Sequence, residues 1–272
     1  MNDYSLKERC AAMNYETVVL EKNGRQATLT LNRPHSMNAM NGLMMKEIAD
    51  ALESLQGDKE VQLLVINGEG KAFSAGGDIK AMLDPNSPLD IETVMVDVSR
   101  LAKALYTLPI ITIASVHGAA AGLGLSLVLG CDVVIAEENS KLAMNFIGIG
   151  LVPDGAGHFF LKERVGIPKA KQLIWSGKVL NGHEALSLGL IDEVTAEGRA
   201  YEQAEVTANK LLASPLKAMI ASKQILHTQH VHELERILAL ESTSQAAMRK
   251  SKDHLEGIQA FVEKRKPHFQ GE

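Results

Sequence analysis

Residues 110–136 read IITIASVHGAAAGLGLSLVLGCDVVIA, and the rest of the chain is organised around this stretch. The apolar, β-branched run at 110–116 predicts a buried strand, and the small residues at 118–124 then open a helical run. A glycine-rich turn between a strand and a helix leaves backbone N–H groups free to hold negative charge. The chain continues to GIGLVPD, which ends at Asp154. This combination indicates a site that stabilises an anion with backbone amides and uses one carboxylate for proton transfer.

A second glycine-rich turn, FSAGGD at 73–78, follows another predicted strand at 61–66. If the N–H groups of the two turns converge, they form a two-donor oxyanion hole. Removing one such donor typically lowers the rate about 100- to 1000-fold. Spacing alone also allows two ordinary tight turns, and this alternative stays open.

Composition and charge restrict the class of protein. The 272 residues carry a net charge of −5, which argues against a nucleic-acid partner, because such proteins usually present a basic face. Cys10 and Cys131 are too few for a disulfide framework, so we expect a reducing, cytoplasmic setting. No apolar run has the length that a membrane span needs, and the polar N-terminus lacks the apolar centre of a signal peptide.

Strand-like and helix-like segments alternate up to residue 199, which predicts an α/β fold, and only helix-like segments follow. We therefore divide the chain into a core at 1–199 and a helical region at 200–272. The predicted strands are 16–20, 26–31, 61–66, 110–116, 133–136 and 190–194. The predicted helices begin near 41, 91, 125, 155, 168, 183, 201, 215, 231 and 254. We expect a loose leader at 1–14 and a mobile loop at 82–88.

Four ordered motifs and the C-terminal segment resemble the crotonase superfamily, which includes the enoyl-CoA hydratases and isomerases. The motifs are LNRP at 31–34, FSAGGD at 73–78, the run from HG at 117–118 to CD at 131–132, and GLVPD at 150–154. The C-terminal match consists of EG at 256–257, AF at 260–261 and EKR at 263–265. The resemblance spans nearly the whole chain. It implies a spiral of strand–strand–helix turns, a C-terminal helical trimerisation region, and assembly as a homotrimer or a dimer of trimers.

The resemblance also implies the substrate and its binding groups. The substrate would be a coenzyme A thioester, with no permanently bound cofactor. Its thioester oxygen would be held by the N–H groups of Gly77 and Leu123, although the second site reads GLG instead of three consecutive small residues. The residues that match CoA-binding positions, or are weaker candidates for the CoA phosphates, are Ala75, Arg33, His35, Lys80, Phe261 and Lys264.

The type of reaction depends on which acidic residues are present. Hydratases of this family resemble one another in having two glutamates that hold a water, and the matching residues here are Ser126 and Phe146. Efficient hydration is therefore not expected. Asp154 matches a catalytic aspartate of several family isomerases, and a well-placed general base contributes roughly 100- to 10 000-fold. The alternative role for Asp154 is an N-cap of the helix that follows.

The resemblance thus predicts an isomerase that moves a double bond in an enoyl-CoA, with an acyl pocket lined by Met144, Phe146 and Ile147. Three alternatives remain: a hydratase of low activity, a ring-opening isomerase of epoxy-acyl-CoA, and a non-catalytic acyl-CoA-binding protein. We expect no metal site, because the spacing of His227 and its neighbours at 230 and 232 spreads them around a helix.

Overall fold

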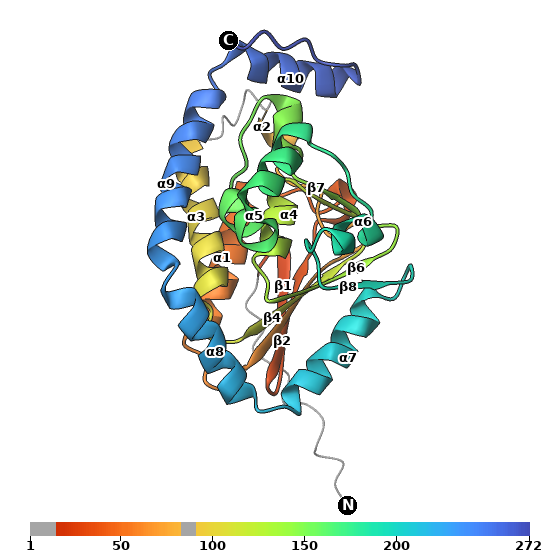
Figure 1. The fold of residues 1–272 in the computed structure, drawn as a ribbon, viewed down its shortest axis with the longest axis vertical. Coiled ribbons are helices and arrows are strands. Elements are labelled where there is room, and N and C mark those ends of the chain that lie inside the picture. The colour runs from red at the N-terminus through yellow and green to blue at the C-terminus, as the bar shows by residue number, and fades with distance from the viewer. Residues whose placement is uncertain (1–14, 83–90) are drawn as a thin grey trace, which may run out of the picture.

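The computed structural model describes residues 15–82 and 91–272 (Figure 1). The predicted leader at 1–14 and nearly all of the predicted loop at 82–88 lie outside these residues. Met82, at the start of that loop, ends the short helix α2 (Ile79–Met82).

A six-stranded sheet forms the centre of the molecule, in the order β1-β2-β3-β4-β6-β8. Its strands are β1 (Val18–Asn23), β2 (Gln26–Leu31), β3 (Leu63–Gly68), β4 (Ile111–Val116), β6 (Val133–Glu137) and β8 (Glu193–Thr195). The first two strands are antiparallel and join at Gly24, whose φ of 57° suits glycine. All other pairs are parallel, and every residue of β4 is buried, as expected for a strand covered on both faces.

Helices pack around this sheet and provide its cover. They are α1 (Gly42–Gln56), α3 (Ile91–Thr107), α4 (Leu123–Leu129), α5 (Gly157–Ser176), α6 (Gly182–Ser187), α7 (Ala200–Leu212), α8 (Leu216–Thr228), α9 (Val231–Met248) and α10 (Lys252–Glu263). Asn41 caps α1 by accepting a hydrogen bond from the Met44 N–H at 3.0 Å, as its position before the apolar run predicted. The α/β fold class is confirmed.

Two turns meet beside a small parallel sheet that the sequence pattern did not reveal. This sheet pairs β5 (Ala119–Ala121) with β7 (Lys141–Ala143). The Ser74 N–H donates to the Ala119 carbonyl at 2.9 Å, and the Ala121 N–H donates to the Ser74 carbonyl at 3.0 Å. These bonds fasten the turn at 73–78 to the start of α4, so the two glycine-rich turns lie side by side.

Helix α5 contains a break at the place where the sequence predicts a new helix. Gly166 has φ 73° and ψ 160°, which is not helical, and Pro168 follows it near the start of the second segment. A 3-10 helix, η2 (Asn145–Ile149), lies between β7 and α5. A second, η1 (Pro34–Ser36), follows β2.

The last helices pack back on the body. Figure 1 shows α8 and α9 running along one side of the molecule, beside α3, and α10 lying across its end. Helix α10 is attached to η2, because His254 Nδ1 lies 2.8 Å from the Ile149 carbonyl oxygen. Gly257 supports the same approach, since a Cβ there would lie 2.7 Å from the Ile149 backbone. Within the described ranges, no helix is both long and apolar enough to cross a bilayer.

Candidate active site

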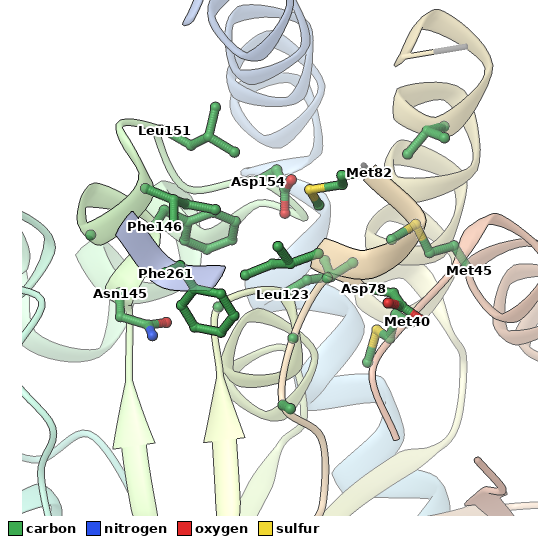
Figure 2. A pocket seen from close by; sticks show the side chains of 18 of the residues that line it. Met40, Met45, Asp78, Met82, Leu123, Asn145, Phe146, Leu151, Asp154 and Phe261 are labelled. Atoms are coloured by element: carbon green, nitrogen blue, oxygen red, sulfur yellow. The ribbon is translucent and has the colours of Figure 1, made fainter. Parts of the chain in front are cut away.

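A pocket with an empty volume of about 970 Å³ opens where the two turns meet η2, α9 and α10 (Figure 2). Its lining residues come from separate parts of the chain. They are Met40, Gly42 and Met45; Ala75 to Ile79 and Met82; Val94; Gly122 and Leu123; Asn145, Phe146, Gly148, Ile149, Leu151 and Asp154; Arg249; and Phe261.

The backbone of both turns faces this pocket. Gly77 and Leu123 both line it, and neither N–H has a hydrogen-bond acceptor among the described residues. Gly76 has φ 93°, and a Cβ there would lie 2.7 Å from the Ala121 carbonyl oxygen, so only glycine fits without strain. Leu123 is the first residue of α4, where the N–H groups are free of intrahelical partners. The structure therefore brings two unpaired donors to one pocket.

Asp154 lies in the same pocket with its carboxyl group pointing into it (Figure 2). The residue is only 8% exposed. Its Oδ2 accepts a hydrogen bond from Gln245 Nε2 at 3.1 Å, whereas Oδ1 has no partner among the described residues. The Ser126 hydroxyl donates to the Asp154 carbonyl at 2.8 Å and so fixes the backbone that carries the carboxyl group.

The environment of Asp154 raises its pKa to about 7. Burial is the main cause, because it disfavours the charged form, and the negative charge of Glu241 adds to it. The positive charge of Arg249 acts in the opposite direction and is the weaker influence. A carboxyl group with this pKa can both accept and return a proton near neutral pH.

The structure contradicts the alternative that Asp154 caps the following helix. The N-cap of α5 is Ala156, and no side chain of its own segment caps it. Glu241 from α9 does so instead, by accepting from the Ala156 N–H at 2.8 Å and from the His158 N–H at 3.1 Å. This carboxylate is 2% exposed and also lies 2.8 Å from His158 Nδ1. The side chain of Asp154 is therefore left free for the pocket.

The residues that replace the hydratase glutamates have different surroundings. Phe146 lines the pocket and is 9% exposed, while Ser126 is fully buried and bonded to the Asp154 carbonyl. The prediction that Met144 and Ile147 line the pocket is wrong. Because η2 turns the backbone at these positions, Met144 points to Ser126, with its sulfur 3.9 Å from the hydroxyl. Ile147 lies on the other side, partly exposed near Gly177, and Asn145, Gly148 and Ile149 line the pocket instead.

The candidate CoA-binding residues divide into two groups. Ala75 and Phe261 line the pocket, and Phe261 is 59% exposed. The other four residues do not line it. Arg33 is held by Asp78 at 3.0 Å and by the Ala39 carbonyl, while the exposed side chains are those of His35, Lys80 and Lys264. Exposed lysines suit an anionic group outside the pocket, and the role of all four residues stays a prediction.

One cluster has the residue types of a metal site. Glu163, His230 and Glu233 place ligand atoms within 4.8 Å of one another. Lys162 Nζ already lies 2.7 Å from Glu233 and 3.0 Å from Glu163, so a cation occupies the position between the carboxylates. His227 does not share this cluster or a solvated face, because its ring stacks on Tyr106 at 4.0 Å.

Sequence reasoning missed two residues of α9, and the residue that directly follows this helix, near Asp154. Glu241 raises its pKa, Gln245 bonds its carboxyl group, and Arg249 lines the pocket. The signal that could have found them is their spacing of four residues, which puts three polar side chains on one helix face. Two of them, Glu241 and Gln245, are buried.

Comparisons with known proteins all point to the same family of enzymes. The sequence model of the enoyl-CoA hydratase/isomerase family matches residues 21–272. YhaR of Bacillus subtilis strain 168, a protein named for the enoyl-CoA hydratases and isomerases, is 49% identical, with 91% of this chain and 96% of that protein covered. The 1,2-epoxyphenylacetyl-CoA isomerase of Escherichia coli K12 is 33% identical, with 90% and 94% covered. Several other relatives are named enoyl-CoA hydratases.

The fold is similar to that of solved structures from the same group. A crystal structure of an enoyl-CoA hydratase from Mycobacterium avium subsp. paratuberculosis K-10 superimposes with a TM-score of 0.86 at 31% identity. The alignment covers 94% of this chain and 100% of that one. The resemblance inferred from the motifs is thereby confirmed.

Proposed function

Because the chain belongs to the enoyl-CoA hydratase/isomerase family, we propose that it shifts a double bond in an enoyl-CoA, with Asp154 carrying the proton. The observation that carries this proposal is a single buried carboxyl group, with a pKa of about 7, in a pocket that two unpaired backbone N–H groups also line.

The proposed reaction has two proton transfers. The Asp154 carboxylate removes a proton from carbon 2 of a 3-enoyl-CoA, and the electron pair moves onto the thioester oxygen to give a dienolate. The N–H groups of Gly77 and Leu123 stabilise that oxygen, which carries more charge in the transition state than in the substrate. Protonated Asp154 then delivers the proton to carbon 4, which yields the 2-enoyl-CoA and restores the carboxylate.

The surroundings of Asp154 favour proton transfer over water addition. Asp78 is the one other carboxyl group among the described residues that line the pocket, and it is held by Arg33 at 3.0 Å. Phe146 puts an aromatic ring, and Ser126 a buried hydroxyl, at the positions that resemble the hydratase glutamates. A pocket with one free carboxyl group lacks the second group that would orient and deprotonate a water.

We further propose that CoA binds as part of the substrate and that the chain forms a homotrimer or a dimer of trimers. The C-terminal helices support assembly, because they leave large apolar side chains exposed. These include Ile225 (67%), Leu226 (68%), Leu240 (60%) and Leu255 (64%). Sedimentation of the full chain would measure the mass of the assembly.

The test of the reaction is to supply 3-enoyl-CoA and 2-enoyl-CoA separately, and to follow isomerisation and hydration of each. We expect conversion of the first and slow or no hydration of the second. Asp154→Asn should lower kcat for isomerisation about 100- to 10 000-fold. Asp78→Asn is the matched comparison, because it removes the other pocket carboxyl group and should act on KM through Arg33.

Two outcomes would contradict the proposal. Turnover of neither substrate would favour an acyl-CoA-binding protein without this activity. Rapid hydration of the 2-enoyl-CoA that survives Asp154→Asn would assign the chain to the hydratases.

A further inference from the structure

Arg249 places a guanidinium group at the pocket with almost nothing to bind. Among the described residues, no carboxylate oxygen lies within 4.0 Å of it, and its one hydrogen-bond acceptor is the thioether of Met82, at 3.7 Å. Sulfur of this kind is a weak acceptor. The Nε atom is buried and has no acceptor at all. Arg249 as a whole is partly exposed, but a buried nitrogen donor is normally hydrogen-bonded, because leaving it unsatisfied is unfavourable.

The unpaired groups gather at one place. In the described ranges, the buried side-chain atoms without a hydrogen-bond partner are Asp154 Oδ1, Gln245 Oε1 and Arg249 Nε. Gln245 bonds directly to Asp154, and Arg249 follows it by one turn on the same face of the α9 segment. Asp154 and Arg249 both line the pocket, whereas Gln245 is fully buried behind Asp154.

This set of groups selects the chemistry of its ligand. A hydroxyl group can accept a hydrogen bond from the guanidinium and donate one to a carboxylate or an amide oxygen. A plain alkyl chain can do neither. A carboxylate could accept from Arg249, but it would be repelled by Glu241, and by Asp154 whenever that group is ionised.

We propose that Arg249 and Asp154, whose carboxyl group Gln245 holds, form a subsite for a hydroxyl group on the acyl chain, so that the preferred substrates are hydroxylated acyl-CoA thioesters. This inference rests on the proposed function for the position of the acyl chain in the pocket. It goes beyond that function in assigning the substrate class, and it makes Arg249 a specificity-determining residue. Asp154 keeps its role in proton transfer.

The experiment measures binding instead of turnover. Saturated C6 acyl-CoA thioesters, plain or with one hydroxyl on carbon 4, 5 or 6, and succinyl-CoA are titrated calorimetrically into the full chain. Saturated thioesters have no double bond to move, so the result does not depend on isomerase activity. We expect at least one hydroxylated thioester to bind about 10- to 100-fold more tightly than its plain counterpart, as a hydrogen bond to a charged group provides.

Variants then assign the preference to the guanidinium. Arg249→Met should abolish the preference and leave the affinity for plain thioesters within a few-fold, and Arg249→Lys should restore part of it. Arg236→Met is the matched control, because Arg236 is an exposed arginine of the same helix. That variant should retain the full preference.

Three results would overturn the inference: equal binding of plain and hydroxylated thioesters, as expected if a water fills the subsite; a preference that survives Arg249→Met; or tightest binding of succinyl-CoA. Failure of the isomerase proposal would look different. It would appear as no turnover of 3-enoyl-CoA while the hydroxyl preference and its loss in Arg249→Met persist.

Discussion

Replacing Asp154 with asparagine should stabilise the folded protein at high pH. This gain in stability should largely disappear at low pH. The carboxyl group has an ordinary pKa of 3.8 in the unfolded chain and about 7 in the fold. Between these values the folded state holds a proton that unfolding releases. The stability contributed by Asp154 is therefore full below its unfolded pKa, falls as the pH rises towards 7, and stays low above it.

The size of the effect follows from the shift. One unit of pKa corresponds to 1.36 kcal/mol, so the shift from 3.8 to about 7 corresponds to roughly 4 kcal/mol at high pH. Asp154 is almost fully buried, so solvent screens little of the cost of ionising it in the folded protein. About 2 to 3 kcal/mol of this change in the free energy of unfolding occurs between pH 5 and pH 8, because the folded protein loses the proton of Asp154 in this interval. Asparagine has nearly the same shape, and its oxygen can still accept from Gln245 Nε2.

The assay is urea unfolding of wild type and Asp154→Asn at pH 5 and pH 8, at equal protein concentration. The difference between the two proteins should grow by about 2 to 3 kcal/mol from the lower to the higher pH. Comparing differences cancels the titration of all other groups. In parallel, kcat/KM of the wild type should rise with pH through an apparent pKa of about 7. A stability difference that is the same at both pH values would refute the assignment of a raised pKa to Asp154.

Other substitutions test the surroundings of the site. Glu241→Gln removes a negative charge that raises the pKa of Asp154, so the acid limb of the rate profile should move to lower pH; a shift upward would contradict this sign. Gly76→Ala should displace the first turn and lower kcat by 100-fold or more, because its Cβ would lie 2.7 Å from a backbone oxygen. Gly57→Ala, at a glycine with nothing within 4 Å, is its control and should leave kcat unchanged. Phe146→Glu should increase hydration of 2-enoyl-CoA, measured by the loss of enoyl absorbance, and no increase would show that a missing carboxylate is not what limits hydration.

The local parts of the site could be predicted because their signals are local. The apolar run of β4, the glycines of the two turns and the break near Pro168 each follow from residues that are neighbours in the chain. The motif at 150–154 likewise singles out Asp154, which lines the pocket. The fold class followed from the order of these elements.

The rest depends on contacts that no local pattern encodes. Gln245 is 91 positions from Asp154, and its contact exists only because α9 packs against the body. The error at Met144 and Ile147 has a similar origin. Successive side chains of a 3-10 helix point in directions that differ from those in a strand or an α-helix. The prediction that the side chains at 144, 146 and 147 all face the pocket did not allow for this.

The capping of α5 by Glu241 has a consequence for protein engineering. Asp154, the proposed proton carrier, belongs to the segment before residue 200, whereas Glu241 and Arg249, whose charges adjust its pKa, belong to the segment after it. A chimaera that joined 1–199 of this chain to the C-terminal part of a relative would keep Asp154 and both amide donors. If Asp154 carries the proton as proposed, the chimaera should acquire a different pH optimum, because recombination at that junction exchanges charges that act on an unchanged carboxyl group.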